Sequence, residues 1–329
     1  MKTIAYLVYG DAIEYHLELT FSIASVVRFL KEDQSDIRIV IVTDKDQCRP
    51  DLPVEYIVYS KKEFDIWTNN GKYNHSAKIN ALSKVLQMSD GPVILLDTDT
   101  YFTEHPEKVF GKISYGNTVM HESEGKVGLM HEWIPLLKLS PSTIMEYTIN
   151  EDCFMYNSGV IGVSSYNIKH LKDAIILTET LFNIKKLFNI EQFSVTNVLI
   201  KHTNVSLTKD MIVHYWKSQN RIFAHLLIRD LVPEFTEKAF QRLVESNVKI
   251  QIPKVSIIDK IISHVLSKIF KWDGNYKFAY IAYRASNSAN SDVYKKAWYE
   301  VAKLFLRKSN YDINNIKRDF KNSKYYKYY

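Results

Sequence analysis

The sequence predicts an α/β fold in which a mainly parallel central sheet is flanked by helices and followed by a helical C-terminal extension. Short apolar runs alternate with segments of helical spacing in the N-terminal part of the chain, which is typical of βαβ units. These runs are continuous, as expected for strands that are buried on both faces. Residues 250–329 contain 16 Lys and Arg against 6 Asp and Glu, whereas residues 1–249 contain 27 against 31. An acidic body with a basic end argues against a nucleic-acid-binding protein.

The N-terminal elements follow from periodicity and residue type. Residues 3–9 and 37–43 are predicted strands, since both are apolar and the second is rich in isoleucine and valine. Residues 14–31 form a predicted helix, because their apolar side chains recur at helical spacing. The same reasoning predicts a strand within 51–59, a helix over 73–88 with Asn74 or Ser76 as its N-cap, and a buried strand over 93–96.

The remaining elements continue this pattern and then become helical. A core strand is predicted at 159–163, and residues 206–213 form a strand-like segment that leads into His214. We place a first domain over residues 1–233 and a basic, helical extension over residues 234–329. The helices predicted in this part of the chain lie near 167–184, 190–201, 234–246, 255–272 and 293–307.

Cysteine usage and hydropathy indicate the compartment. Cys48 and Cys153 have no partners at metal-site spacing, which favours a reducing environment. The apolar run over residues 3–9 is too short for a signal-peptide core. No run approaches the roughly 18 apolar residues that a membrane span needs. We therefore expect a cytoplasmic protein that is soluble or peripheral on the inner face of the cell membrane.

Two carboxylates follow the predicted strand 93–96 directly. Ligands of parallel α/β sheets bind beyond the carboxyl ends of the strands, which is where Asp97 and Asp99 are expected to lie. Carboxylates this close repel each other unless a hard divalent cation such as Mg²⁺ or Mn²⁺ lies between them. The D-x-D triplet is therefore a candidate platform for a metal and a diphosphate. The alternative is an exposed turn in which Asp99 caps backbone amides.

Three further stretches carry polar groups that suit the same crevice. Asn157 and Ser158 precede the core strand 159–163, with a glycine that permits close backbone approach; an ordinary turn is the alternative. Glu191 and Gln192 open a helix and can bond sugar hydroxyls, although charge near a helix N-terminus is also favourable by itself. His214 follows a strand-like segment, and its imidazole is a candidate to complete the metal's ligand shell.

The ordered set of motifs resembles the GT-A-type nucleotide-sugar glycosyltransferases. The resemblance spans roughly residues 3–220 and is carried by TIAYLVYG, HSAKINAL, LLDTDTYF, NSGVIGV, EQF and VHYW. The set is most similar to the retaining, glycogenin-like and bacterial lipopolysaccharide glycosyltransferase-like group. That group usually follows its metal-binding histidine with a glycine and then a lysine, whereas His214 is followed by Tyr215, Trp216 and Lys217.

The resemblance implies a GT-A fold and a role for each matching residue. Asp99 and His214 would bind Mn²⁺ or Mg²⁺, and Asp97 would contact the ribose or the metal. Lys78 would neutralise phosphate or orient Asp97. The remaining roles implied by the resemblance are base and ribose binding by Tyr9, Gly10 and Asp44, and contact with donor sugar and acceptor by Asn157, Ser158, Glu191 and Gln192.

The implied reaction is sugar transfer from a nucleotide-diphosphate donor, by default a UDP-sugar, to a surface-glycan or lipid-linked acceptor. The resemblance favours retention of anomeric configuration, although Glu151, Asp152 and Glu191 are available as the base that an inverting enzyme needs. One competing hypothesis is a haloacid-dehalogenase-type Mg²⁺-dependent phosphohydrolase, which also places D-x-D after an apolar strand. The other is a non-catalytic scaffold that binds carbohydrate or membrane.

The basic C-terminal region contains a strongly amphipathic segment. Its apolar residues recur at helical spacing over residues 257–270, and Lys254, Lys260, Lys268 and Lys271 surround them. Such a helix suits an anionic membrane surface. The alternative is that this stripe packs on the catalytic domain or in a dimer interface. The last residues, KNSKYYKYY, are a second candidate surface anchor or a site for an acidic acceptor.

Overall fold

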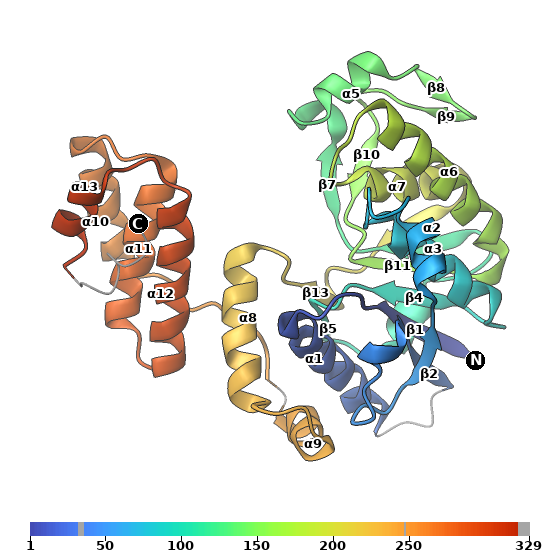
Figure 1. The fold of residues 1–329 in the computed structure, drawn as a ribbon, viewed down its shortest axis with the longest axis horizontal. Helices are drawn as coiled ribbons and strands as arrows, with labels where there is room; N and C mark the ends of the chain where they lie inside the picture. The colour runs from blue at the N-terminus through green and yellow to red at the C-terminus, as the bar shows by residue number, and fades with distance from the viewer. Residues whose placement is uncertain (32–35, 247, 322–329) are drawn as a thin grey trace. The chain divides into compact units, whose positions relative to one another are not determined.

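The computed structural model describes residues 1–31, 36–246 and 248–321 (Figure 1). The chain divides into two compact units. The first consists of Met1–His214 and Phe235–Asn247, and the second of Tyr215–Glu234 and Val248–Tyr329. The tyrosine-rich tail that we singled out lies, from residue 322 onward, outside the described residues.

A central sheet organises the first unit. Among the described residues, seven strands are arranged in the order β12-β6-β11-β4-β1-β2-β3. All neighbours are parallel except β11, which runs antiparallel to both β4 and β6. The predicted α/β class with a mainly parallel sheet is therefore confirmed. The strands are β1 (Lys2–Leu7), β2 (Ile37–Thr43), β3 (Glu55–Val58), β4 (Val93–Leu96), β6 (Asn117–Met120), β11 (Val160–Val163) and β12 (Asn204–Leu207).

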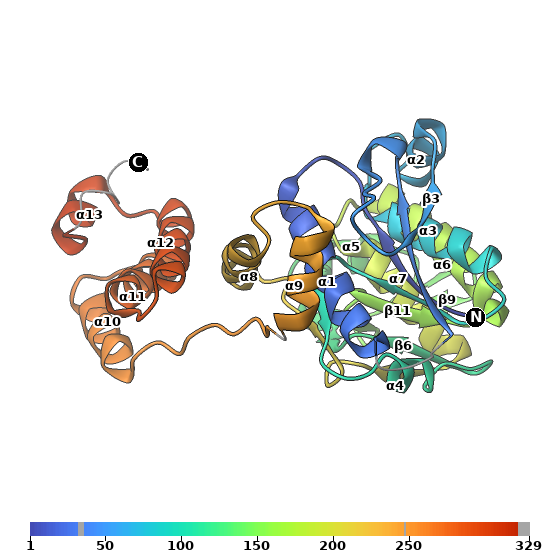
Figure 2. The same ribbon diagram turned by 90° about the horizontal axis from the view of Figure 1, so that it is seen from below.

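Helices cover the sheet because each has one apolar face to bury. Helices α3, α6 and α7 contact one another and share a single apolar core with β1, β4 and β11. Figure 2 shows α9 lying beside α1, and the two helices contact each other. These helices are α1 (Ile13–Leu30), α3 (Ser76–Gln87), α6 (Ile168–Ile184), α7 (Ile190–His202) and α9 (Glu237–Ser246).

Several small elements lie outside the central sheet. Strands β5 and β13 pair with each other, as do β7 with β10 and β8 with β9, and all three pairs are antiparallel. Their bounds are β5 (Thr100–Phe102), β7 (Ser123–Lys126), β8 (Thr143–Ile144), β9 (Tyr147–Thr148), β10 (Phe154–Tyr156) and β13 (Ile212–His214), and the short helices are α2 (Lys61–Trp67), α4 (Glu107–Phe110) and α5 (Ile134–Leu139).

Two local predictions were wrong. The segment 206–213 is not one strand, because β12 ends at Leu207 and β13 begins at Ile212. Neither Asn74 nor Ser76 is the N-cap of α3. Ser76 is the first helical residue, and its hydroxyl donates to the carbonyls of Tyr73 and Trp67 instead of capping the helix.

The second unit consists of helices, and we predicted a helical extension in this part of the chain. Its apolar core brings Phe223 of α8 against Trp298 of α12, with ring centroids 4.9 Å apart. Within the described residues, no helix is both long and apolar enough to cross a membrane. The helices are α8 (Ser218–Leu231), α10 (Ile257–Ile269), α11 (Gly274–Ser288), α12 (Asp292–Arg307) and α13 (Ile313–Asp319).

We placed a single domain boundary between residues 233 and 234, but each of the two units consists of two separate stretches of the chain. Helix α8 belongs to the second unit because it packs on α12. Helix α9 belongs to the first unit because it packs on α1, where the Arg28 guanidinium donates to the carbonyl of Val244 at 2.9 Å. The chain therefore leaves the first unit after His214, returns to it as α9, and leaves it again.

Candidate active site

The D-x-D segment leaves the sheet at the carboxyl end of β4, as predicted. The Asp97 amide donates to the carbonyl of Gly159 at 2.9 Å, and the Thr100 hydroxyl donates to the carbonyl of Asp97 at 2.8 Å. Between the aspartates, the Thr98 hydroxyl donates to the buried carboxylate of Glu18 at 2.9 Å. These bonds hold the segment in place, so the two aspartate carboxylates are presented from a fixed backbone.

His214 meets these carboxylates because β13 pairs with β5, which sets His214 opposite Thr100. Its Nε2 lies 3.0 Å from Asp99 Oδ1 and 3.9 Å from Asp97 Oδ2. Its Nδ1 lies 2.9 Å from Asn157 Oδ1. The antiparallel pairing thus brings His214 to a turn that lies more than a hundred positions earlier in the chain.

The protonation pattern of His214 follows from its neighbours. The Asn157 amide is oriented by two bonds, since its Nδ2 donates to Glu124 at 2.8 Å and its Oδ1 accepts from the Gly159 amide at 2.9 Å. Because Oδ1 can only accept, Nδ1 of His214 carries a hydrogen. Nε2 is left facing the carboxylates, as a donor to Asp99 or as a lone pair that requires a cation between the groups.

The spacing of this cluster fits a hard divalent cation. One ligand atom from each of Asp97, Asp99 and His214 can be chosen so that all lie within 4.8 Å of one another. Adjacent ligands of an octahedral Mg²⁺ are about 3.0 Å apart when each lies about 2.1 Å from the ion. The 3.0 Å separation of Nε2 from Asp99 Oδ1 matches that value. Two carboxylates and one imidazole are also ligands that Mn²⁺ accepts.

A glycine makes room for the histidine ring. A Cβ placed on Gly159 would lie 2.3 Å from both Cε1 and Nδ1 of His214. The sequence predicted close backbone approach at this glycine, and the structure identifies the group that approaches.

Lys78 orients one of the two aspartates. It projects from α3, and its Nζ lies 2.6 Å from Asp97 Oδ1 and 2.8 Å from Oδ2. The same Nζ lies 3.3 Å from both the carbonyl and the hydroxyl of Ser158. Burial alone would lower the pKa of Lys78, but the carboxylates of Asp97 and Glu191 raise this pKa above its usual range. Lys78 is therefore a charged group at the centre of the site.

The first turn of α7 supplies a buried acid. Glu191 is 3% exposed, and its Oε2 accepts a bond from the Ser158 hydroxyl at 3.2 Å. Within the described residues its Oε1 is buried without a hydrogen-bond partner. Burial raises the pKa of Glu191 to about 7, although Lys78 opposes the shift. This carboxyl group consequently exchanges its proton near neutral pH.

Glu124 is a member of the site that the sequence did not reveal. Its two oxygens accept bonds from Asn157 Nδ2 at 2.8 Å and from Gln192 Nε2 at 2.9 Å. Gln192 Oε1 in turn accepts from the Ser158 amide at 3.3 Å. Glu124 lies on the short strand β7, which has no apolar periodicity, so only the pairing of β7 with β10 reveals its position.

His121 is a second member that the sequence missed. Its ring is 4% exposed and lies edge-on to His214, with centroids 5.3 Å apart. Its Nε2 donates to the carbonyl of Ile212 at 3.0 Å. Burial, and then the proximity of His214, lower the pKa of His121. A neutral ring packs beside His214 without adding positive charge to the cluster.

The residues expected to hold base and ribose lie after β1 and β2. Tyr9 packs its ring 5.2 Å from that of Phe64, and burial raises its pKa. Gly10 has φ +77°, a conformation that favours glycine. Asp44 caps the short turn that follows β2, where its carboxylate accepts from the Asp46 amide at 3.0 Å. Their nucleotide-binding roles stay predictions.

Comparison with solved structures finds chains that are similar to this one. No family model matches the chain, and no curated protein matches it. The chain is similar in structure to the galactosyltransferase LgtC in complex with donor and acceptor sugar analogs, at 12% sequence identity and a TM-score of 0.43. The match covers 63% of this chain and 74% of that one.

Proposed function

We propose that this chain is a metal-dependent glycosyltransferase that moves a sugar from a nucleotide-diphosphate donor, by default a UDP-sugar, to a glycan or lipid-linked acceptor. The observation that carries the proposal is the convergence of Asp97, Asp99 and His214 at the carboxyl end of β4. Their ligand atoms lie within 4.8 Å of one another. A bound Mn²⁺ or Mg²⁺ there would stabilise the negative charge of the leaving diphosphate.

The protein's own residues prepare this site before any donor binds. Asn157 holds the His214 ring through Nδ1, so the ring cannot turn its other nitrogen away from the aspartates. Lys78 fixes both oxygens of Asp97 and keeps positive charge close to the proposed diphosphate position. In this proposal Tyr9, Gly10 and Asp44 bind the base and ribose, beyond the ends of β1 and β2.

The proposed sugar and acceptor subsite is formed by two residues of the turn between β10 and β11 and two residues of α7. Asn157 and Gln192 are joined through Glu124, and Ser158 is bonded to Glu191 and Lys78. This network orders side chains that can donate to and accept from sugar hydroxyls. We propose a retaining reaction, in agreement with the resemblance. The anomeric configuration of the product, read by NMR, tests it, and an inverted product contradicts it.

A thermal-shift panel tests the proposed function. Nucleoside diphosphates and nucleotide sugars would each be added with and without Mn²⁺ to the wild type, to Asp99→Ala and to the exposed control Asp90→Ala. We expect one nucleotide to raise the midpoint only with Mn²⁺, in the wild type and the control but not in Asp99→Ala. Such binding stabilises by about 2.7 kcal/mol at a hundredfold excess over Kd. No shift with any nucleotide would refute the proposal and favour the phosphohydrolase or the scaffold.

The second unit offers a surface for the proposed membrane partner. On α10, Asp259 and Ser263 are buried, and Asp259 accepts a bond from the Arg284 guanidinium of α11 at 2.5 Å. The opposite face therefore exposes large apolar residues, and a groove of about 760 Å³ lies between α10, α11 and α12. Lysines flank this face. The exposed apolar residues are Ile257, Ile258, Ile261, Val265 and Ile269.

We propose that this face rests on an anionic membrane, which would hold the enzyme on the inner face of the cell membrane near a lipid-linked acceptor. Co-sedimentation with phosphatidylglycerol vesicles tests it, with neutral phosphatidylcholine vesicles for comparison. Ile258→Glu should reduce binding. Ile66→Glu is the matched control, because Ile66 is 65% exposed on the first unit and Ile258 is 66% exposed. Equal binding by both variants would contradict the proposal.

A further inference from the structure

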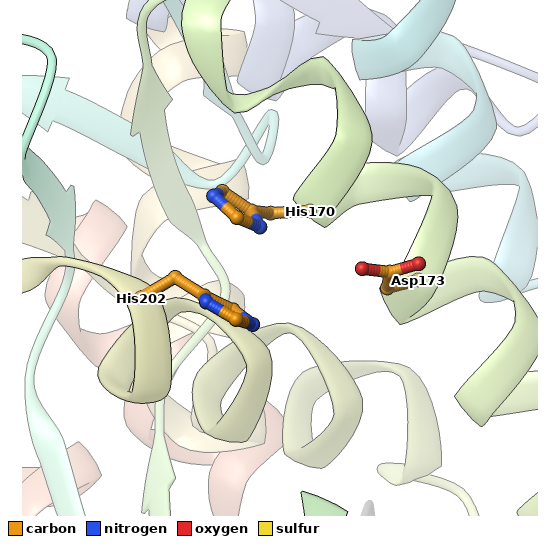
Figure 3. A group of neighbouring side chains, drawn as sticks. All are labelled: His170, Asp173 and His202. Atoms are coloured by element: carbon orange, nitrogen blue, oxygen red, sulfur yellow. The ribbon is translucent and has the colours of Figure 1, made fainter. Parts of the chain in front are cut away.

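A second cluster of metal-ligand type lies away from the D-x-D segment. His170 and Asp173 are one helical turn apart on α6, and His202 is the last residue of α7. Figure 3 shows the two imidazole rings one above the other, with the Asp173 carboxylate beside them. Helix α7 runs from Ile190 to His202, so His202 lies about 16 Å from Glu191 along the helix axis. The cluster is therefore separate from the site described above.

The cluster contains an unsatisfied ligand atom. Within the described residues, Nδ1 of His170 is buried without a hydrogen-bond partner, and such an atom destabilises a fold unless something binds it. A neutral imidazole binds a metal through the lone pair of one ring nitrogen.

The two rings and the carboxylate are close enough to share one ion. The rings are stacked with centroids 4.2 Å apart and planes 10° apart. One ligand atom from each of the three residues can be chosen so that all lie within 4.8 Å of one another. Ligands about 2.1 Å from a tetrahedral zinc ion are about 3.4 Å apart. No pair of atoms therefore has to close by more than about 1.4 Å. Because an imidazole lone pair lies in the plane of its ring, the two nearly parallel rings must also tilt toward each other to share the ion.

Tyr147 and Glu146 are the polar neighbours of these three residues. Tyr147 is buried, and its hydroxyl lies 3.2 Å from Asp173 Oδ2 and 3.1 Å from His202 Nε2, so it orients both groups. Glu146 lies 3.5 Å from His202 Nε2 but is paired with Lys201 at 3.2 Å. Lys201 contacts Oε2 of Glu146, whereas Oε1 is the oxygen that faces His202.

We propose that His170, Asp173 and His202 bind a zinc-type divalent cation with water as the fourth ligand. Two imidazoles and one carboxylate prefer zinc to the oxygen-seeking Mg²⁺. The cation joins the C-terminal end of α7 to the first turns of α6. Because α7 carries Glu191 and Gln192 in its first turn, the cation also steadies the helix that positions those side chains.

Titration calorimetry with Zn²⁺ tests this site in the Asp99→Ala background, in which the D-x-D site is disabled. We expect one ion per chain. His170→Ala and His202→Ala should each weaken binding at least tenfold, whereas His131→Ala, an exposed histidine on the same unit, should leave it unchanged. Absence of stoichiometric Zn²⁺ binding in the Asp99→Ala protein would overturn the proposal. Equal affinity in all three histidine variants would overturn it as well.

A spectroscopic arm keeps the test valid if a histidine variant fails to fold. Co²⁺ added to the folded Asp99→Ala protein should give the intense visible bands of a four-coordinate site, and Zn²⁺ should displace them. Only the weak bands of an octahedral aqueous ion would overturn the proposal. The milder Asp173→Asn variant, which keeps size and hydrogen bonding, should shift the bands and weaken binding.

Discussion

Gly159→Ala tests the close approach of β11 to the histidine ring. The added Cβ would lie 2.3 Å from Cε1 and Nδ1 of His214, whereas ordinary contacts begin at 3.4 Å. Movement of the glycine backbone is opposed by two bonds, from its amide to Asn157 and to its carbonyl from Asp97. The His214 side chain is 4% exposed, so the ring has little free space. The ring must nevertheless move by about 1 Å, which overpacks the site.

The expected effect is larger on function than on stability. Overpacking costs about 1–3 kcal/mol of unfolding free energy. A misplacement of about 1 Å at a reacting site costs about a hundredfold in rate, and a metal-ligand distance tolerates only about 0.2 Å. We therefore expect Gly159→Ala to lose at least tenfold in Mn²⁺ affinity by calorimetry. It should also lose about a hundredfold in kcat/KM once the donor is known.

The chain offers a matched control three residues further along, within β11. A Cβ on Gly162 would lie 2.4 Å from Val119 Cγ2, so Gly162→Ala should cost similar stability but leave Mn²⁺ affinity unchanged. Replacing His214 with alanine in the Gly159→Ala protein removes the clash and should recover stability, so the two substitutions should not be additive. If Gly159→Ala binds Mn²⁺ as the wild type does, the histidine is not a ligand.

Three further outcomes are expected. Lys78→Met leaves Asp97 unpaired and should lower the free energy of unfolding, measured in urea, by about 2–3 kcal/mol. Adding Asp97→Asn to this variant should partly restore the free energy of unfolding, and an unchanged stability of Lys78→Met would contradict the ion pair. The fold favours the protonated form of Glu191, because the pKa of this group is raised from 4.5 to about 7. The protonated group therefore contributes about 3 kcal/mol to the free energy of unfolding. This contribution is full below pH 4.5 and is lost as the pH rises through 7. In Glu191→Gln the urea unfolding midpoints at pH 5 and pH 8 should no longer differ through this group. If the midpoints differ as much as in the wild type, another group titrates. Asn157→Leu removes the acceptor for His214 Nδ1, so calorimetry should show Mn²⁺ binding weakened about 10–100-fold. A Mn²⁺ affinity equal to that of the wild type would contradict this role.

The sequence indicated the parts of the site whose position depends on a strand end. Asp97 and Asp99 follow an unbroken apolar run, so their place at the edge of the sheet follows from the direction of β4 alone. Lys78 was given two alternative roles, and its contacts with both oxygens of Asp97 favour the orienting one. These residues are recognisable because local periodicity determines where they emerge.

Other members of the site depend on long-range pairing and have no local signal. Glu124 joins Asn157 to Gln192 only because β7 pairs with β10. His121 follows β6, and its contact with His214 depends on the antiparallel insertion of β11 beside that strand. Periodicity reports which face of an element is buried but not which element covers it, so neither position was predictable.

His214 is also the last residue before the chain passes into the second unit. The first stretch of the first unit, Met1–His214, ends at this residue, and Tyr215 begins the second unit. The imidazole that faces both aspartates is therefore carried by the residue at which the chain passes from one unit to the other. The return of the chain as α9 adds a tether, since Arg28 holds the end of that helix against α1.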